Sequence, residues 1–177
     1  EQYGYPFNQI ASGDLLAGVP DLVGERIRII GRVLDGDGVA VNDAMVEIWQ
    51  ADAQGRYAHP ADTRIANSGF KGFGRTGTGT DGQNRFLFDT VKPASVDGVQ
   101  APHINVCIFA RGLLNHLFTR IYFDDEVDAN ASDPTLATVP ETRRPTLVAR
   151  RSNDTGGVHY EFDIALQGDN ETVFLDV

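Results

Sequence analysis

The four histidines and the single cysteine are the residues whose types could carry metal or nucleophilic chemistry in this chain of 177 residues. His59, His103, His116 and His159 are far apart in the sequence, so any metal site that uses them must be assembled by the fold. A hydrogen bond where a loop meets a strand is a commoner role for His103 than metal ligation. Cys107 lies in an apolar run, so a small buried hydrophobic residue is favoured over a catalytic thiol. These residues indicate no self-sufficient active site.

A glycine-dense run and an acidic run are the other segments with possible chemistry. Residues 69–82 are dense in glycine but contain no Gly-Lys-Ser/Thr, which favours a flexible loop over a nucleotide site. The acidic run Asp124-Asp125-Glu126 is interpreted as a solvated turn after a strand, with cation binding as the alternative. The net charge of −10 argues against nucleic acid as a partner, because nucleic acid rewards clustered Lys and Arg.

The composition is that of a globular protein, with 41% hydrophobic residues. A single cysteine cannot form an internal disulfide, which fits a reducing compartment. No apolar run approaches the ~20 residues that span a bilayer, and the first residues lack a signal-peptide pattern. We therefore expect a cytoplasmic protein with no membrane partner.

The elements that must position the histidines and the cysteine are short segments of alternating polar and apolar residues, separated by glycine and aspartate. This alternation predicts strands. Residues 57–75 show no periodicity, and residues 125–133 form the best helical candidate. We predict one all-β domain over residues 1–177, a β-sandwich of about eight mostly antiparallel strands with long connecting loops. The predicted strands cover residues 25–34, 43–50, 85–90, 103–110, 117–123, 146–151, 158–166 and 172–177.

Seven segments, in order and spacing, resemble the intradiol ring-cleavage dioxygenases from about residue 25 to the end of the chain. The run from Glu47 to Asp52 and the Lys92-Pro93 and Pro102-His103 elements are specific to this family. The full set is Arg32–Gly38, Val46–Asp52, Gly74–Thr76, Thr90–Pro93, Ala101–Ile104, Arg120–Asp125 and Tyr160–Ile164.

The resemblance implies a ferric ion held by two tyrosinates and two histidines, a ligand set that suits Fe(III). The first family histidine matches His103, but the second falls on Asn105. One family tyrosine falls near Ile65, and the other falls in residues 94–100, which contain no tyrosine. The resemblance therefore implies that this chain binds no iron and holds only vestigial ligand positions.

The loss of the ligands implies an alpha-type subunit, which has no catalytic residue and pairs with an iron-bearing beta subunit. Fe(III) is then a cofactor of the partner, and residues 1–24 form an N-terminal arm that packs on it. The resemblance further implies αβ protomers in a higher symmetric assembly that cleaves a small aromatic substrate with O2.

Three residues of this chain are expected to line the partner's active-site cleft. Arg111 matches a family arginine there, and its guanidinium would attract a ring carboxylate. Tyr3 and Pro6 belong to the arm segment that lines the same cleft. The alternative for Arg111 is a rim arginine with no role in substrate binding.

Two other functions remain open for the chain as a whole. It could be a stand-alone β-sandwich binding module that has lost catalysis, which would have no iron-bearing partner. It could also be an independently active dioxygenase with unusual ligands, which would carry iron by itself.

Overall fold

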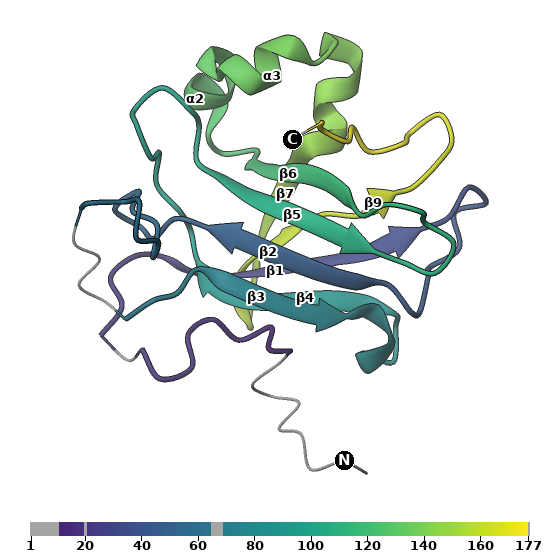
Figure 1. Ribbon diagram of the computed structural model, residues 1–177, viewed down its shortest axis with the longest axis horizontal. Helices are drawn as coiled ribbons and strands as arrows, with labels where there is room; N and C mark the ends of the chain where they lie inside the picture. Colours follow the sequence, from purple (N-terminus) through teal and green to yellow (C-terminus); the bar gives the residue numbers. More distant parts are fainter. Residues whose placement is uncertain (1–10, 20, 65–68, 177) are drawn as a thin grey trace.

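Two packed layers of strands build the molecule, as Figure 1 shows. The computed structural model describes residues 11–19, 21–64 and 69–176, and within them nine strands follow the order β3-β2-β5-β6-β7-β8-β1-β4, with β9 beside β1. The strands are β1 (Arg26–Leu34), β2 (Met45–Gln50), β3 (Phe73–Gly77), β4 (Arg85–Val91), β5 (His103–Phe109), β6 (Leu117–Phe123), β7 (Val148–Asp154), β8 (Gly157–Glu161) and β9 (Ile164–Ala165).

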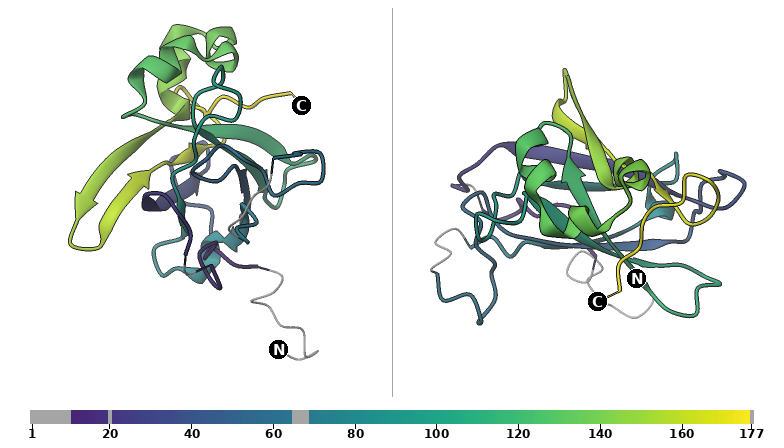
Figure 2. Two further views of the ribbon diagram at one scale, coloured as in Figure 1. Left: turned by 90° about the vertical axis from the view of Figure 1, so that its left-hand side faces the viewer. Right: turned by 90° about the horizontal axis from the view of Figure 1, so that it is seen from above.

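Five of the eight strand pairings are antiparallel, and the parallel ones are β1 with β8, β1 with β9, and β6 with β7. Strand β7 links the layers, because it pairs with β6 at Val148 and Ala149 and with β8 along the rest of its length. Its hairpin with β8 extends to one side of the sandwich in the left-hand view of Figure 2. The predicted all-β sandwich of mostly antiparallel strands is confirmed.

Side chains along each strand point alternately to the two faces of the sheet, so one face of each strand packs in the core. In β1 the inward residues are Ile27, Ile29 and Val33, and the burial of each is worth about 1.5–3 kcal/mol. Gly31 continues this inward face, where a Cβ would overlap the carbonyl oxygen of Phe162. Strands β2, β4 and β5 add alternate residues to the same core, namely Val46, Ile48, Phe86, Phe88, Ile104, Val106 and Ile108.

A second, smaller core lies under the helical segment at the edge of the sandwich above β6 (Figure 1). It contains Ala101, Tyr122, Leu136, Val139 and Leu147. The segment comprises α2 (Val127–Ser132), α3 (Pro134–Thr138) and the 3-10 helix η2 (Glu141–Leu147); the short 3-10 helix η1 (Thr78–Thr80) follows β3. None of the described helices is long and apolar enough to cross a membrane.

The structure confirms a helix within residues 125–133 but corrects three strand predictions. The strand predicted over residues 158–166 is divided into β8 and β9, with a break at residues 162 and 163. Residues 172–176 form no strand, because only one backbone bond, from Leu175 N to Phe118 O (2.8 Å), ties them to β6. The strand predicted over residues 146–151 starts only at Val148, after η2. Strand β3 was missed, because glycine interrupts its sequence and its pairing with β2 defines it.

Part of the predicted N-terminal arm packs on the sandwich of its own chain. The structure describes this arm over residues 11–19 and 21–24. Leu15, Val19 and Leu22 are buried in the main core. The backbone of Asp89 donates to Gly13 O (2.8 Å) and accepts from Leu15 N (2.9 Å). Residues 1–10, which include Tyr3 and Pro6, lie outside the described residues.

Candidate functional site

His103 and Asn105 stand two residues apart at the start of β5, so their side chains share one face of the sheet. Across the antiparallel pairing, His103 lies opposite Tyr122 and Asn105 lies opposite Arg120. The third vestigial position, Ile65, lies outside the described residues. Two of the three predicted positions are therefore brought to one place.

His103 is buried and is held by the loop that precedes it. Its Nδ1 lies 2.8 Å from Ala101 O, which assigns the proton to Nδ1 and the lone pair to Nε2. Burial lowers the pKa of the imidazole, and the nearby Arg120 cation lowers it further, while the bond to Ala101 raises it. The prediction of a hydrogen bond at a junction of loop and strand is confirmed for this residue.

Both the nitrogen and the oxygen of the Asn105 side-chain amide form hydrogen bonds. Its Nδ2 donates to the Tyr57 hydroxyl (3.1 Å) and to Trp49 O (3.3 Å), and its Oδ1 accepts from Arg120 Nε (3.1 Å). Tyr57 is fixed from the other side because its ring stacks on that of Trp49, with centroids 5.7 Å apart. Burial raises the pKa of Tyr57, so its hydroxyl is neutral at pH 7.

Arg120 reaches across the site and joins it to two neighbouring segments. Its Nη1 donates to Gln100 Oε1 (3.0 Å) and to Thr135 Oγ1 (3.2 Å), beside the Tyr122 hydroxyl at 3.5 Å. Tyr57, His103, Asn105 and Arg120 are called the Asn105 cluster below. The sequence reasoning missed the roles of Tyr57 and Arg120. Neither role had a local signal in the sequence, because the register of β5 and β6 brings Arg120 opposite Asn105, and Tyr57 comes from a loop 48 residues earlier.

The Asn105 cluster does not fit a ferric ion. A metal needs anionic or imidazole lone pairs, whereas Asn105 offers a neutral oxygen that already accepts from a guanidinium. Arg120 also places a permanent positive charge at the site, which repels a cation. In the described part of the chain, no group of three or more His, Cys, Asp or Glu side chains is placed to hold a metal ion.

The loop that lacks the family tyrosine is closed by its own hydrogen bonds. Asp97 Oδ1 accepts from Val99 N (2.9 Å) and Gln100 N (2.8 Å), and Ser95 Oγ donates to Gln100 O (2.6 Å). Gly98 adopts a φ of +72°, which an L side chain rarely tolerates. This loop positions Gln100 against Arg120.

Acid is expected to open this loop. The backbone bonds from Gln100 and Val99 lower the pKa of Asp97 from 3.8 to about 2. A lowered folded-state pKa contributes stability above pH 3.8 that is lost as pH falls towards 2, because the protonated carboxyl accepts these bonds poorly. Titration of the Asp97 carboxyl carbon by NMR checks this. A midpoint near 3.8, as expected for the carboxyl of an unstructured control peptide, would contradict it.

Cys107 is expected to react slowly with alkylating reagents. Burial, and then the nearby Glu47 carboxylate, raise the pKa of its thiol to about 11. At pH 8 only about one molecule in a thousand carries the thiolate, which is the nucleophile. Iodoacetamide labelling followed by mass spectrometry measures the rate, with the urea-unfolded chain as a fast-reacting control. Equal rates in both states would show that the fold does not suppress the reactivity of Cys107 and would contradict the raised pKa.

Arg111 lies away from the Asn105 cluster, in the connection that follows β5. It is 85% exposed and makes one ion pair, to Asp43 at 2.9 Å. It follows Asn105 by six positions, and β5 alone carries the chain about 13 Å from Asn105 to Phe109. A side chain so placed does not contact the Asn105 cluster.

The acidic run after β6 is accounted for by cations of the protein. It forms the predicted turn, and Lys92 Nζ lies 2.8 Å from Asp125 and 2.6 Å from Glu126. Asp125 also accepts from the Tyr160 hydroxyl at 3.0 Å. The carboxylates are therefore paired within the fold.

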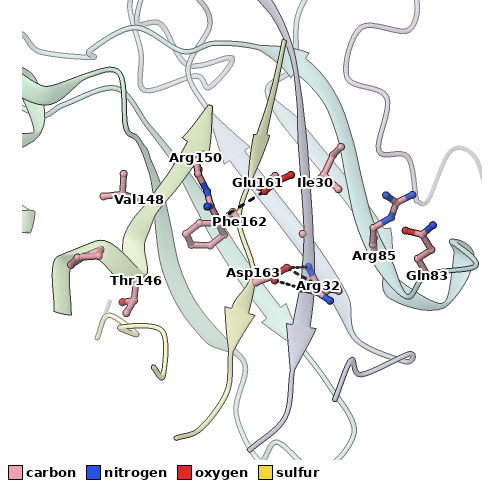
Figure 3. A pocket seen from close by; sticks show the side chains of 12 residues that line it. Ile30, Arg32, Gln83, Arg85, Thr146, Val148, Arg150, Glu161, Phe162 and Asp163 are labelled. Atoms are coloured by element: carbon pink, nitrogen blue, oxygen red, sulfur yellow. Dashed lines mark hydrogen bonds and ion pairs between the residues drawn. The ribbon is translucent and has the colours of Figure 1, made fainter. Parts of the chain in front are cut away.

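A cavity of about 430 Å³ on the outer face of β1 and β8 is lined by charged side chains, each of which has an oppositely charged neighbour. Figure 3 shows Arg32 directed at Asp163, with the closest contact at 2.6 Å. Arg85 is paired in the same way with Asp81 at 3.0 Å. Exposed pairs of this kind contribute little stability, and each arginine here already has a carboxylate beside it.

Comparison with known proteins identifies the family. The alpha chain of protocatechuate 3,4-dioxygenase from Burkholderia cepacia is 50% identical to this chain, over all of this chain and 89% of the relative. A family model described as dioxygenase matches residues 8–168. This chain belongs to the intradiol dioxygenase family. The resemblance inferred from the motifs is thereby confirmed, and non-haem iron is the cofactor of this family in general.

Two further comparisons bear on the subunit type and on the fold. The beta chain of protocatechuate 3,4-dioxygenase from Burkholderia cepacia is 38% identical over 85% of this chain and 68% of the relative. An intradiol ring-cleavage dioxygenase from Tetranychus urticae has the same fold, with a TM-score of 0.67 and 19% identity over 92% of this chain and 90% of that one. Identity is thus higher to the alpha chain than to the beta chain.

Proposed function

We propose that this chain is the alpha-type subunit of a protocatechuate 3,4-dioxygenase. That enzyme cleaves the ring of 3,4-dihydroxybenzoate with O2 to give 3-carboxy-cis,cis-muconate. The observation that carries the proposal is the Asn105 cluster, where a neutral amide bonded to a guanidinium stands in place of an iron ligand. A chain that keeps the fold and motifs of the family but not its ligands acts through a partner.

The partner is an iron-bearing beta subunit of the same family, which holds the Fe(III). Residues 1–10 are the part of the arm that we assign to the partner, because residues 13–22 include side chains committed to the chain's own core. The two chains form αβ protomers in a closed symmetric assembly in the cytoplasm. Iron in the partner supplies the activation of the catechol ring, and this chain supplies binding groups.

Arg111 is the binding group that we assign to the substrate, together with Tyr3 and Pro6. Its ion pair with Asp43 is solvent-exposed, so breaking it costs well under about 1 kcal/mol. The planar fork of the guanidinium matches a ring carboxylate in a bidentate contact. Arg111 then orients the catechol ring and takes no part in proton transfer.

Co-expression with an iron-bearing chain tests the proposal. The purified chain alone is expected to contain no iron, to show no tyrosinate-to-iron colour and to leave protocatechuate unchanged. The two chains together are expected to co-purify and to consume O2 and protocatechuate in equal amounts.

The other outcomes separate the alternatives. A chain that never co-purifies with an iron-bearing chain would be a stand-alone binding module. A coloured, iron-loaded chain that turns over substrate without a partner would be an independent dioxygenase, and either result would overturn the proposal.

A further inference from the structure

A cavity of about 530 Å³ lies beside the Asn105 cluster, between β6, α3 and the C-terminal segment. Figure 1 shows these three elements together at one edge of the sandwich. The volume is typical of sites that hold a small molecule. Phe118, Arg120, Thr135, Val139, Phe174 and Asp176 are among its lining residues.

Arg120 brings a positive charge to this cavity that the described residues leave without a carboxylate partner. Within residues 11–19, 21–64 and 69–176, its hydrogen bonds go to neutral oxygens, those of Asn105, Gln100, Thr135 and Tyr122. In the part of the chain that the structure describes, no carboxylate forms an ion pair with it within 4.0 Å. A half-buried cation with only neutral partners gains free energy when an anion binds.

Asp133 is an acid that contacts this network, but its carboxylate is already hydrogen-bonded to other groups. Asp133 accepts from the Tyr122 hydroxyl (3.1 Å), from Ala101 N (2.8 Å) and from Leu136 N (2.8 Å), and it meets Arg120 only through that hydroxyl. The Nη2 of Arg120 makes none of the hydrogen bonds given above. Arg32 and Arg85, in the cavity of Figure 3, differ because each is paired directly with a carboxylate.

The remaining walls determine which anion fits. Phe118, Val139 and Phe174 present apolar surface, while Thr135 presents a hydroxyl. We propose that this cavity binds a small organic carboxylate, with its carboxylate on Arg120 and its apolar body against these three side chains. Asp176, an exposed residue of the lining, opposes the anion and tunes its affinity. The inference goes beyond the proposed function, because it requires neither iron nor a partner chain.

Calorimetric titration of the full chain with matched probes tests the ligand class. Benzoate has both the charge and the apolar body, benzamide has the body alone, and acetate and phosphate have the charge alone. Benzoate is expected to bind at least about tenfold more tightly than each of the other three, because only it satisfies Arg120 and the apolar walls together. Equal binding of benzamide and benzoate, tightest binding by phosphate, or no benzoate binding at millimolar concentration would overturn the proposal.

Variants locate the site. Arg120→Gln is expected to weaken benzoate binding at least about tenfold, and Arg120→Lys less, because Lys keeps the charge but loses the fork. Arg150→Gln, a change at a 79%-exposed arginine elsewhere, is the matched control and should bind like wild type.

Asp176→Lys keeps the test decisive if Arg120→Gln fails to fold, since residue 176 is exposed. It should tighten benzoate binding about threefold or more by removing a negative charge and adding a positive one. Unchanged affinity in Asp176→Lys, or in a folded Arg120→Gln, would place benzoate outside this cavity.

Discussion

Asp133→Ala is expected to destabilise the chain by about 3–5 kcal/mol, because it removes the acceptor of three buried hydrogen bonds. The fully buried carboxylate accepts from Ala101 N (2.8 Å), Leu136 N (2.8 Å) and the Tyr122 hydroxyl (3.1 Å). The bond from Leu136 caps the N-terminus of α3, and the bond from Ala101 fixes the loop before His103. Each donor that is left without a partner in this small core costs its desolvation free energy.

Urea unfolding followed by circular dichroism measures the change. Asp133→Asn, which keeps an acceptor oxygen, should lose less than the alanine variant. Asp169→Ala, at an exposed position, is the control and should stay within about 0.5 kcal/mol of wild type. A loss below about 1 kcal/mol in Asp133→Ala would show that water replaces the carboxylate and that this core is open to solvent.

Arg111→Ala, made in the complex of this chain with its iron-bearing partner, is expected to lower kcat/KM for protocatechuate about 10- to 100-fold. The reason is the loss of a charge-assisted, two-point bond to the ring carboxylate. Iron content should be unchanged, because Arg111 touches no ligand position. Steady-state O2 uptake and iron analysis on the same preparations measure both quantities.

The substrate supplies the internal control for Arg111. Turnover of catechol, which has no carboxylate, should be the same in Arg111→Ala and in wild type. Arg111→Lys should recover part of the loss for protocatechuate, and Asp43→Ala, which frees the guanidinium, should leave kcat/KM near that of wild type. Unchanged kinetics in Arg111→Ala would make Arg111 a rim residue without a role in substrate binding.

The alternation of residue types was sufficient to place most of the sandwich. Strands β1, β2, β4, β5 and β6 follow the period-2 pattern, because one face of each packs in the core. Strand β3 has no such pattern, since it is defined by its pairing with β2. Residues 172–176 have strand-like composition but make too few backbone bonds for a ladder, which sequence periodicity does not report.

The vestigial ligand positions show the same division. The sequence by itself determined that a neutral amide, Asn105, stands where the family has a histidine, and that residues 94–100 contain no tyrosine. Only the tertiary structure decided what occupies that place. Arg120 enters through the register of β5 and β6, and Tyr57 enters from a loop 48 residues before Asn105. Contacts between residues this far apart in the sequence depend on how strands pair and how loops close. The residue types in any one segment of the chain do not determine these contacts.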